Sequence, residues 1–153
     1  MKGPVLIGVL LNVLLCAAYD VRRPTSLGHV GGQKIDILGT TIEEFRGIPF
    51  ALPPVGELRF KPPVPAKAWR GTLNATSRRS GCPQPVGVEP ITGDIEYGED
   101  CLHLNVWARE GSTNAPVLVW IYGGAFTYSS ASADNYTGAV IAAKTGIVVA
   151  SMN

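Results

Sequence analysis

The decisive stretch of the sequence is Pro116-Val117-Leu118-Val119-Trp120-Ile121-Tyr122-Gly123-Gly124-Ala125-Phe126. Its apolar residues do not alternate with polar ones, which predicts a strand that is buried on both faces. The two glycines that end the run allow a sharp turn and a close approach of the backbone to a ligand. Ligands bind at the carboxyl ends of the strands in an open α/β sheet. Main-chain N–H groups here would suit the oxyanion of an acyl transfer, although two glycines alone also fit a simple turn.

The residues after the glycines predict a β-strand–α-helix–β-strand unit. Ser132 or Asp134 is a candidate N-cap for a helix that continues to about Lys144 and ends at Gly146. The inward-facing candidates of this helix are Val140, Ile141 and Ala143. Residues 147–152 then predict a second buried strand, parallel to the first in a right-handed unit. Two such strands need further strands and helices to cover them, so the sheet is expected to be incomplete.

The upstream residues predict strands of a different kind. Residues 27–50 are typical of two strands joined by a turn, with Gly31-Gly32 breaking the first and residues 40–45 alternating in the second. Residues 102–107 alternate cleanly, which predicts a strand with one buried face, and residues 111–115 predict a turn. The expected fold class is therefore α/β, a mixed sheet with antiparallel first strands followed by a parallel βαβ unit.

Proline and glycine mark the irregular segments. In residues 47–65 the prolines exclude a helix or a central strand, which leaves a polyproline ligand, a linker or a stiff loop. The regularly placed apolar residues favour a loop that packs onto a core. They are Phe50, Leu52, Val55, Leu58 and Phe60. Residues 69–80 are expected to be a polar connection, and residues 82–101 an irregular surface loop.

Composition and the amino terminus narrow the class of protein. Of 153 residues 46% are hydrophobic and 16% charged, which argues against disorder, and a net charge of +1 offers no attraction for nucleic acid or an anionic membrane. Residues 1–18 predict a signal peptide, because Lys2 precedes an apolar run over residues 5–15 that is too short to span a bilayer and Ala17-Ala18 provides a cleavage site. An uncleaved anchor is the alternative. We therefore expect a secreted protein without a membrane span.

In a secreted protein, the cysteines are candidates for a disulfide and the asparagine sequons are candidates for glycosylation. Once Cys16 leaves with the signal peptide, Cys82 and Cys101 remain as an even pair in an oxidising compartment. Their spacing, even with His103 nearby, does not match a structural zinc site, so we expect neither a metal nor a cofactor. Asn74 and Asn135 begin Asn-x-Thr glycosylation sequons. His29 has no acidic or nucleophilic neighbour in the sequence and is interpreted as an ordinary strand or surface residue.

Three motifs, in order along the chain, resemble the signatures of one family. They are Gly47-Ile48-Pro49-Phe50-Ala51-Leu52-Pro53-Pro54-Val55-Gly56-Glu57-Leu58-Arg59-Phe60, Glu99-Asp100-Cys101-Leu102-His103-Leu104-Asn105-Val106-Trp107 and Trp120-Ile121-Tyr122-Gly123-Gly124-Ala125-Phe126. The family is that of the type-B carboxylesterases, α/β-hydrolases that include cholinesterases and several lipases. The resemblance covers roughly residues 25–153. It implies that residues 19–153 are a partial carboxylesterase domain.

The resemblance implies a role for the two glycines. Backbone N–H groups of Gly124 and Ala125 would bind the oxyanion, and Gly123 would shape the loop. Many members have a third glycine where this chain has Ala125, which retains its N–H. The family's nucleophilic serine, acidic partner and histidine have no counterpart in this chain, which stops before the Gly-x-Ser-x-Gly nucleophile elbow. His29 and His103 do not match that histidine. The candidates rejected as nucleophiles are Ser129, Ser130 and Ser132, because none is in an elbow motif.

The resemblance also implies a disulfide, a salt bridge and a class of substrate. Cys82 and Cys101 match the family's first disulfide, and Arg59 and Glu99 match a salt bridge. Cholinesterases carry a tryptophan inside that disulfide loop, where it stacks on a quaternary ammonium, and this chain has none between the two cysteines. The implied protein is a secreted hydrolase of small uncharged carboxylic esters or lipids, with this part inactive alone. The alternatives are a non-catalytic adhesion protein of the same fold and a finished secreted binding module.

Overall fold

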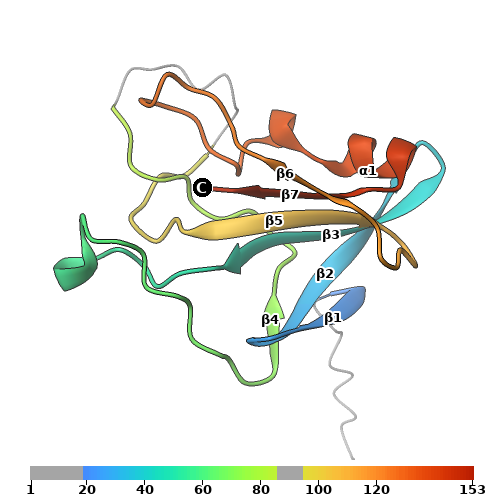
Figure 1. The fold of residues 1–153 in the computed structure, drawn as a ribbon, viewed down its shortest axis with the longest axis horizontal. Helices are drawn as coiled ribbons and strands as arrows, with labels where there is room; N and C mark the ends of the chain where they lie inside the picture. The colour runs from blue at the N-terminus through green and yellow to red at the C-terminus, as the bar shows by residue number, and fades with distance from the viewer. Residues whose placement is uncertain (1–18, 86–94) are drawn as a thin grey trace, which may run out of the picture.

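The structure is a computed structural model that describes residues 19–85 and 95–153. The expected signal peptide, residues 1–18, and the middle of the expected surface loop, residues 86–94, lie outside the described residues. The described residues form one open sheet with a helix on one face (Figure 1). The strands are β1 (Val21–Thr25), β2 (Gly28–Ile37), β3 (Thr40–Pro49), β4 (Thr72–Asn74), β5 (His103–Arg109), β6 (Val117–Trp120) and β7 (Val148–Met152). The helices are α1 (Ala139–Thr145) and the 3₁₀ turns η1 (Gly56–Leu58) and η2 (Asp134–Tyr136).

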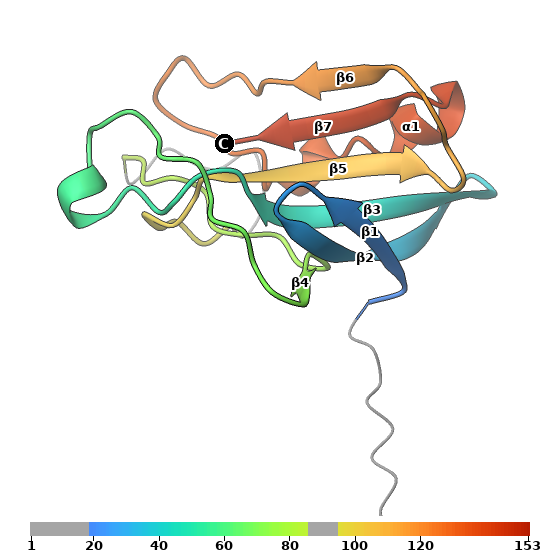
Figure 2. The same cartoon turned by 60° about the horizontal axis from the view of Figure 1, so that its bottom comes forward.

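The order of the strands is β1-β2-β3-β5-β7-β6, and β4 pairs with β2 (Figure 2). The pairs β1/β2, β2/β3, β3/β5 and β5/β7 are antiparallel. The pair β6/β7 is parallel, with α1 between its strands in the chain. The expected α/β class is confirmed: an open, mixed, mostly antiparallel sheet consistent with part of an α/β-hydrolase fold.

The two glycines of β2 do not break the strand, contrary to expectation. β2 pairs with β1 up to Gly32 and with β3 from Gln33 onward, so the strand changes partner at this point. A Cβ at Gly32 would lie 2.4 Å from the carbonyl oxygen of Glu44. Glycine therefore permits a close approach of the two backbones here and leaves the strand continuous.

Two clusters of buried residues cover the two faces of the sheet. Under α1 the buried side chains are Ile42, Trp107, Ala139, Ala142, Ala143 and Val149. The other cluster comprises Val21, Val30, Phe45 and Ala75. β5 alternates as predicted, and its buried face carries His103, Asn105 and Trp107. Small residues on α1 let the helix approach closely, because a Cβ at Gly138 would lie 2.6 Å from Val149.

The start and the inward face of the helix differ from the expectation. α1 begins at Ala139 after Gly138, whereas Asp134 begins the turn η2 and Ser132 is buried in the preceding segment. Val140 and Ile141 are exposed, and only Ala143 of the three predicted inward residues is buried. The alanines face the sheet because bulkier side chains would hold the helix too far from it. Gly146 ends the helix in the left-handed region (φ 76°), as predicted.

β6 is exposed, although its apolar sequence predicts burial on both faces. The four residues of β6 are all exposed, between 40% and 62%. β6 is the edge strand of the described sheet, and α1 packs mainly against β5, β3 and β7. Burial of an edge strand requires neighbours, and no described segment supplies them on its outer side.

The proline-rich segment folds as a stiff loop whose packing was predicted only in part. The amide of Leu52 donates to Val64 and that of Ala66 to Phe50, so the loop closes on itself. Its one short helical element is η1, and no central strand passes through it. Phe60 is 94% exposed, which overturns the prediction for that residue, and Val55 is exposed as well. The polar connection also contains an unpredicted strand, β4, because its three residues give too short a pattern to detect.

Candidate functional site

A strained loop follows β6 at the carboxyl end of that strand. This segment, residues 121–129, is called the glycine loop. The amides of Thr127 and Tyr128 donate to the carbonyl oxygen of Gly124 (2.9 and 3.1 Å), which closes a tight turn. Gly124 has φ 152°, and a Cβ there would lie 1.8 Å from the carbonyl oxygen of Tyr128. Only glycine can therefore occupy position 124 without moving the backbone.

Other residues of the glycine loop adopt a backbone that is unfavourable for them. Ala125, Phe126 and Ser129 have φ values of 52°, 60° and 97°. Left-handed backbone conformations cost free energy in residues that have a Cβ. Such conformations persist where the surrounding structure holds them and are concentrated at functional sites.

The bend leaves main-chain donors without acceptors. Within residues 19–85 and 95–153, the amide nitrogens of Gly123, Gly124, Ala125 and Phe126 donate no hydrogen bond. The same residues line a cavity of about 700 Å³, which Gln84, Tyr122 and Asn153 also line. Adjacent unpaired amides beside a cavity can receive a negatively charged oxygen.

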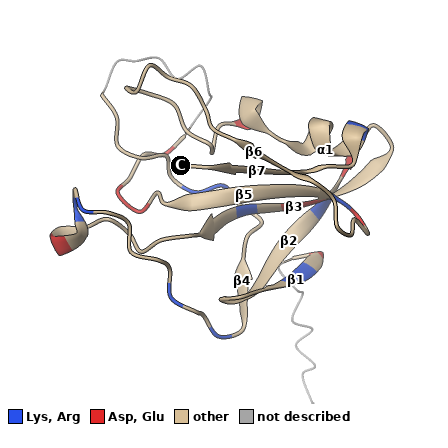
Figure 3. Cartoon of the chain, viewed as in Figure 1, with Lys and Arg blue, Asp and Glu red and all other residues tan. Residues whose placement is uncertain are grey.

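The cavity wall is uncharged. None of its lining residues is Asp, Glu, Lys or Arg, and residues 111–133 carry no such side chain. Figure 3 shows this as a stretch of ribbon without blue or red, which includes β6 and the glycine loop. Burial raises the pKa of the half-buried Tyr122 phenol, which keeps it neutral at physiological pH. The site therefore presents N–H dipoles and apolar surface without a charged side chain.

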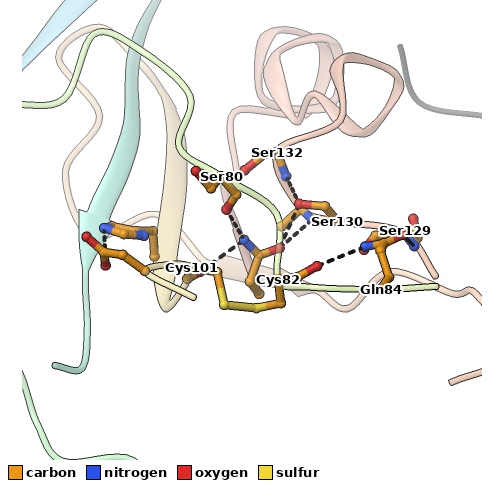
Figure 4. Close-up of a disulfide and its surroundings, with 11 residues drawn as sticks. Ser80, Cys82, Gln84, Cys101, Ser129, Ser130 and Ser132 are labelled. Carbon is orange, nitrogen blue, oxygen red and sulfur yellow. Dashed lines mark hydrogen bonds and ion pairs between the residues drawn. A yellow bond between two sulfur atoms is a disulfide. The ribbon is translucent and has the colours of Figure 1, made fainter. Parts of the chain in front are cut away.

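The expected disulfide is present beside the cavity, and the expected ion pair is present elsewhere in the described chain. Cys82 and Cys101 form a disulfide, with their Cα atoms 5.0 Å apart (Figure 4). Arg59 Nη2 lies 3.2 Å from Glu99 Oε1. Both of these side chains are substantially exposed, so the ion pair contributes little to stability. The disulfide places the segment around Cys82 against the glycine loop.

Two amide side chains that sequence reasoning missed surround the disulfide. Gln84 Oε1 accepts from the amide of Ser129 and Nε2 donates to the carbonyl of Ser129, both at 2.9 Å. Asn153 Oδ1 accepts from the hydroxyl of Ser130 and the amide of Ala131. Its Nδ2 donates to backbone carbonyls of Ser80 and Cys101. No pattern in the sequence signals these contacts, because they join distant segments.

The serines near the loop have structural partners. Ser130 Oγ donates to Asn153 and accepts from the amide of Ser132, and Ser129 Oγ lies 3.4 Å from Tyr136 Oη. All three serines are buried, and in the described part of the chain none is hydrogen-bonded to a histidine.

The two histidines occupy separate strands. His29 lies in β2, and its backbone carbonyl accepts from Trp69 Nε1. His103 is buried in β5, where its Nδ1 has no described partner and its Nε2 lies 3.7 Å from Asp100. Burial is the main cause that lowers the pKa of His103, Arg79 lowers it further, and Asp100 opposes the shift. His103 is therefore largely neutral near pH 7.

The remaining candidates are surface features. Asn74 and Asn135 are both exposed, and Asn74 Oδ1 accepts from the amide and hydroxyl of Thr76. Glycosylation at these two residues stays a prediction.

Across the described ranges no cluster of three His, Cys, Asp or Glu side chains is arranged for a metal ion. No helix in those ranges has the length and apolar character that crossing a membrane requires.

A mixed sheet with a bent glycine loop at the end of its parallel strand is consistent with part of an α/β-hydrolase fold. The profile of the carboxylesterase family matches residues 20–153, and the chain belongs to that family. It is 46% identical to an acetylcholinesterase of Gallus gallus over 141 residues, which cover 84% of this chain and 18% of that protein. It is 40% identical to a cholinesterase of Mus musculus over 157 residues (92% and 26%). An acetylcholinesterase of Bungarus fasciatus is 37% identical over 162 residues (94% and 27%). The chain thus spans about a fifth to a quarter of the length of these relatives.

Proposed function

We propose that this chain is the amino-terminal, oxyanion-binding part of a secreted carboxylic ester hydrolase. The observation that carries the proposal is the row of unpaired amides from Gly123 to Phe126 beside a cavity of about 700 Å³. Family membership supports an esterase-like activity for the whole protein.

In the proposed mechanism, one part of the enzyme supplies the nucleophile and this chain supplies the oxyanion-binding amides. A serine, activated by a histidine, attacks the ester carbonyl, and the carbonyl oxygen becomes negatively charged. The amides of Gly124 and Ala125, together with the amide after the serine, donate to that oxygen. Removing one donor of this kind typically costs about 3 kcal/mol of transition-state stabilisation.

The 153 residues are proposed to be inactive by themselves, because their sequence contains no Gly-x-Ser-x-Gly motif. The test compares the purified chain with the product of the longer reading frame that contains it, using p-nitrophenyl butyrate. We expect hydrolysis by the longer protein only. Enzymatic turnover by the short chain would contradict the proposal that the 153 residues are inactive by themselves.

The proposed substrate is an uncharged ester or lipid, supported by the uncharged cavity wall and the absence of tryptophan between Cys82 and Cys101. The names of the relatives, acetylcholinesterase and cholinesterase, favour a choline ester instead. The longer protein can be assayed with butyrylthiocholine and with p-nitrophenyl butyrate. A higher kcat/KM for the uncharged ester supports our assignment, and a preference for the thiocholine ester overturns it.

A non-catalytic adhesion or binding protein of the same fold is the second candidate, since its glycine loop could be retained without the nucleophile. The residue at the nucleophile elbow of the longer protein distinguishes the two: serine indicates an enzyme, and another residue indicates a binding protein. A monomeric, cooperatively melting 153-residue chain would instead favour a finished binding module.

Secretion and glycosylation are part of the same proposal, and the Cys82–Cys101 disulfide supports them because such bonds persist in oxidising compartments. Expression in a secreting eukaryotic cell, followed by removal of N-linked glycans, tests both. We expect the protein to appear in the medium and its mass to fall on deglycosylation. The fall in mass should be smaller for the Asn74→Gln and Asn135→Gln variants than for the parent.

A further inference from the structure

The glycine loop needs an external support. Ala125 and Phe126 adopt left-handed backbone conformations, and the Phe126 side chain is fully exposed, so packing of that side chain does not hold the bend. The described bonds within the loop all converge on the carbonyl of Gly124. They close the turn but do not attach it to the sheet.

Gln84 supplies the missing attachment. Its carboxamide pairs with both backbone groups of Ser129, at 2.9 Å each, and its Nε2 also lies 3.2 Å from the carbonyl of Cys82 (Figure 4). The Gln84 side chain thus bonds the backbone of the glycine loop from outside that loop. Ser129 has φ 97°, so the bond is made to a residue that is itself strained.

The position of Gln84 is itself fixed. Gln84 follows Cys82 by two residues, and Cys82 is bonded to the buried Cys101. The carbonyl of Cys101 accepts from Asn153 Nδ2, and Asn153 directly follows β7. A continuous path of bonds therefore connects the end of the central strands, through the disulfide and Gln84, to the glycine loop.

We propose that Gln84 is a positioning residue that holds the amides of Gly124 and Ala125 in place for the oxyanion. This role rests on the proposed esterase function. A neutral carboxamide suits it because one side chain must donate to a carbonyl and accept from an amide at the same residue. Alanine removes both bonds, and an ionised carboxylate can accept from the amide of Ser129 but repels the carbonyl.

Hydrogen exchange on the full chain tests the attachment without any activity. The readout is the exchange of a peptide covering residues 121–129, in which Thr127, Tyr128 and Ser129 have bonded amides. In Gln84→Ala we expect about tenfold faster exchange of this peptide, the effect of losing about 1.4 kcal/mol of local stability. A peptide covering residues 40–49 of β3 reports the integrity of the fold. Pro85→Ala, an adjacent exposed change, is the control and should match the parent.

Gln84→Glu provides a conservative rescue. At about pH 7 the ionised side chain of this variant cannot donate to the Ser129 carbonyl, so the 121–129 peptide should exchange as fast as in Gln84→Ala. At about pH 4 or below the carboxyl group is protonated and can again both donate and accept. Protection relative to the parent at the same pH should therefore return in acid. Unchanged exchange in Gln84→Ala, equal acceleration in β3, or a failure of acid to restore protection would each overturn the proposal.

The longer protein provides the catalytic readout. Gln84→Ala should lower kcat about tenfold while KM changes less than about twofold, because the oxyanion forms only in the transition state. A loss of kcat/KM that came equally from a higher KM would overturn the positioning role. An inactive parent would contradict the proposed function, and the exchange experiment would still decide whether Gln84 holds the glycine loop.

Discussion

At the residue scale, Ala125 carries a conformation that glycine adopts more easily. Its φ of 52° lies in the left-handed region, which a residue with a Cβ occupies only at a cost. The Cβ of Ala125 therefore costs free energy here that a glycine would not. The main-chain N–H of Ala125 remains available in either case, because it donates no hydrogen bond within the described residues.

Ala125→Gly should raise the free energy of unfolding by about 0.5–1 kcal/mol, since relief of the left-handed conformation exceeds the added chain entropy. Urea denaturation measures the change. Ala133→Gly is the matched control, because Ala133 has φ −67° and gains no relief. That control should lose about 1 kcal/mol. A loss of similar size in both variants would show that Ala125 is not strained.

His103 makes stability depend on pH. Because burial lowers its pKa below 6.5 in the folded chain, the unfolded chain binds the proton more readily. The free energy of unfolding should therefore fall as pH decreases through 6.5 toward the lower folded pKa, and stay level above 6.5. Urea denaturation between about pH 5 and 8 measures this. His103→Gln should flatten the dependence over that range. A parent whose stability is constant through this range would contradict the assignment.

At the scale of elements, local patterns predicted the types of strand better than their burial. Alternation identified β5, and Gly146 identified the end of α1, because both signals depend on neighbouring residues in the chain. The apolar run at β6 predicted a strand correctly but its burial wrongly, since burial depends on which segments lie alongside. The inward face of α1 was missed for the same reason, because the approach of the helix to the sheet is set by Gly138 and its neighbours.

The exposed edge of β6 predicts self-association of the chain. β6 is apolar and pairs only with β7 among the described strands, which leaves its outer edge free to add another strand. Val119→Lys should shift the chain toward monomer, because a charge on an edge strand opposes pairing. Val140→Lys, on the exposed side of α1, is the matched control and should associate like the parent. Sedimentation velocity over a range of concentrations measures both. Equal association of all three proteins would exclude the β6 edge.

At the scale of the whole molecule, the site is built from contacts that no local pattern encodes. The three family motifs located the glycine loop, the disulfide and the Arg59–Glu99 ion pair, because each lies within or beside a long signature. Gln84 and Asn153 escaped prediction because the contacts that define their roles are distant along the chain: Ser129 is 45 residues from Gln84, and the partners of the Asn153 side chain are 22 to 73 residues away. Isolated amide residues have no spacing rule, so only the fold reveals what they join.

The Asn153 side chain joins the end of β7 to three other segments of the chain, and its replacement tests whether that junction supports the fold. Its side chain uses both donors and two acceptor sites, to Ser80, Cys101, Ser130 and Ala131. Asn153→Asp retains the shape and the Oδ1 acceptor but replaces the NH2 group by one oxygen, which then faces the carbonyls of Ser80 and Cys101. Urea denaturation should show a loss of about 2 kcal/mol. Asn114→Asp makes the same chemical change at an exposed residue and should alter stability by less than about 0.5 kcal/mol. Similar small losses in both variants would mean that the segments around the disulfide are held together without Asn153.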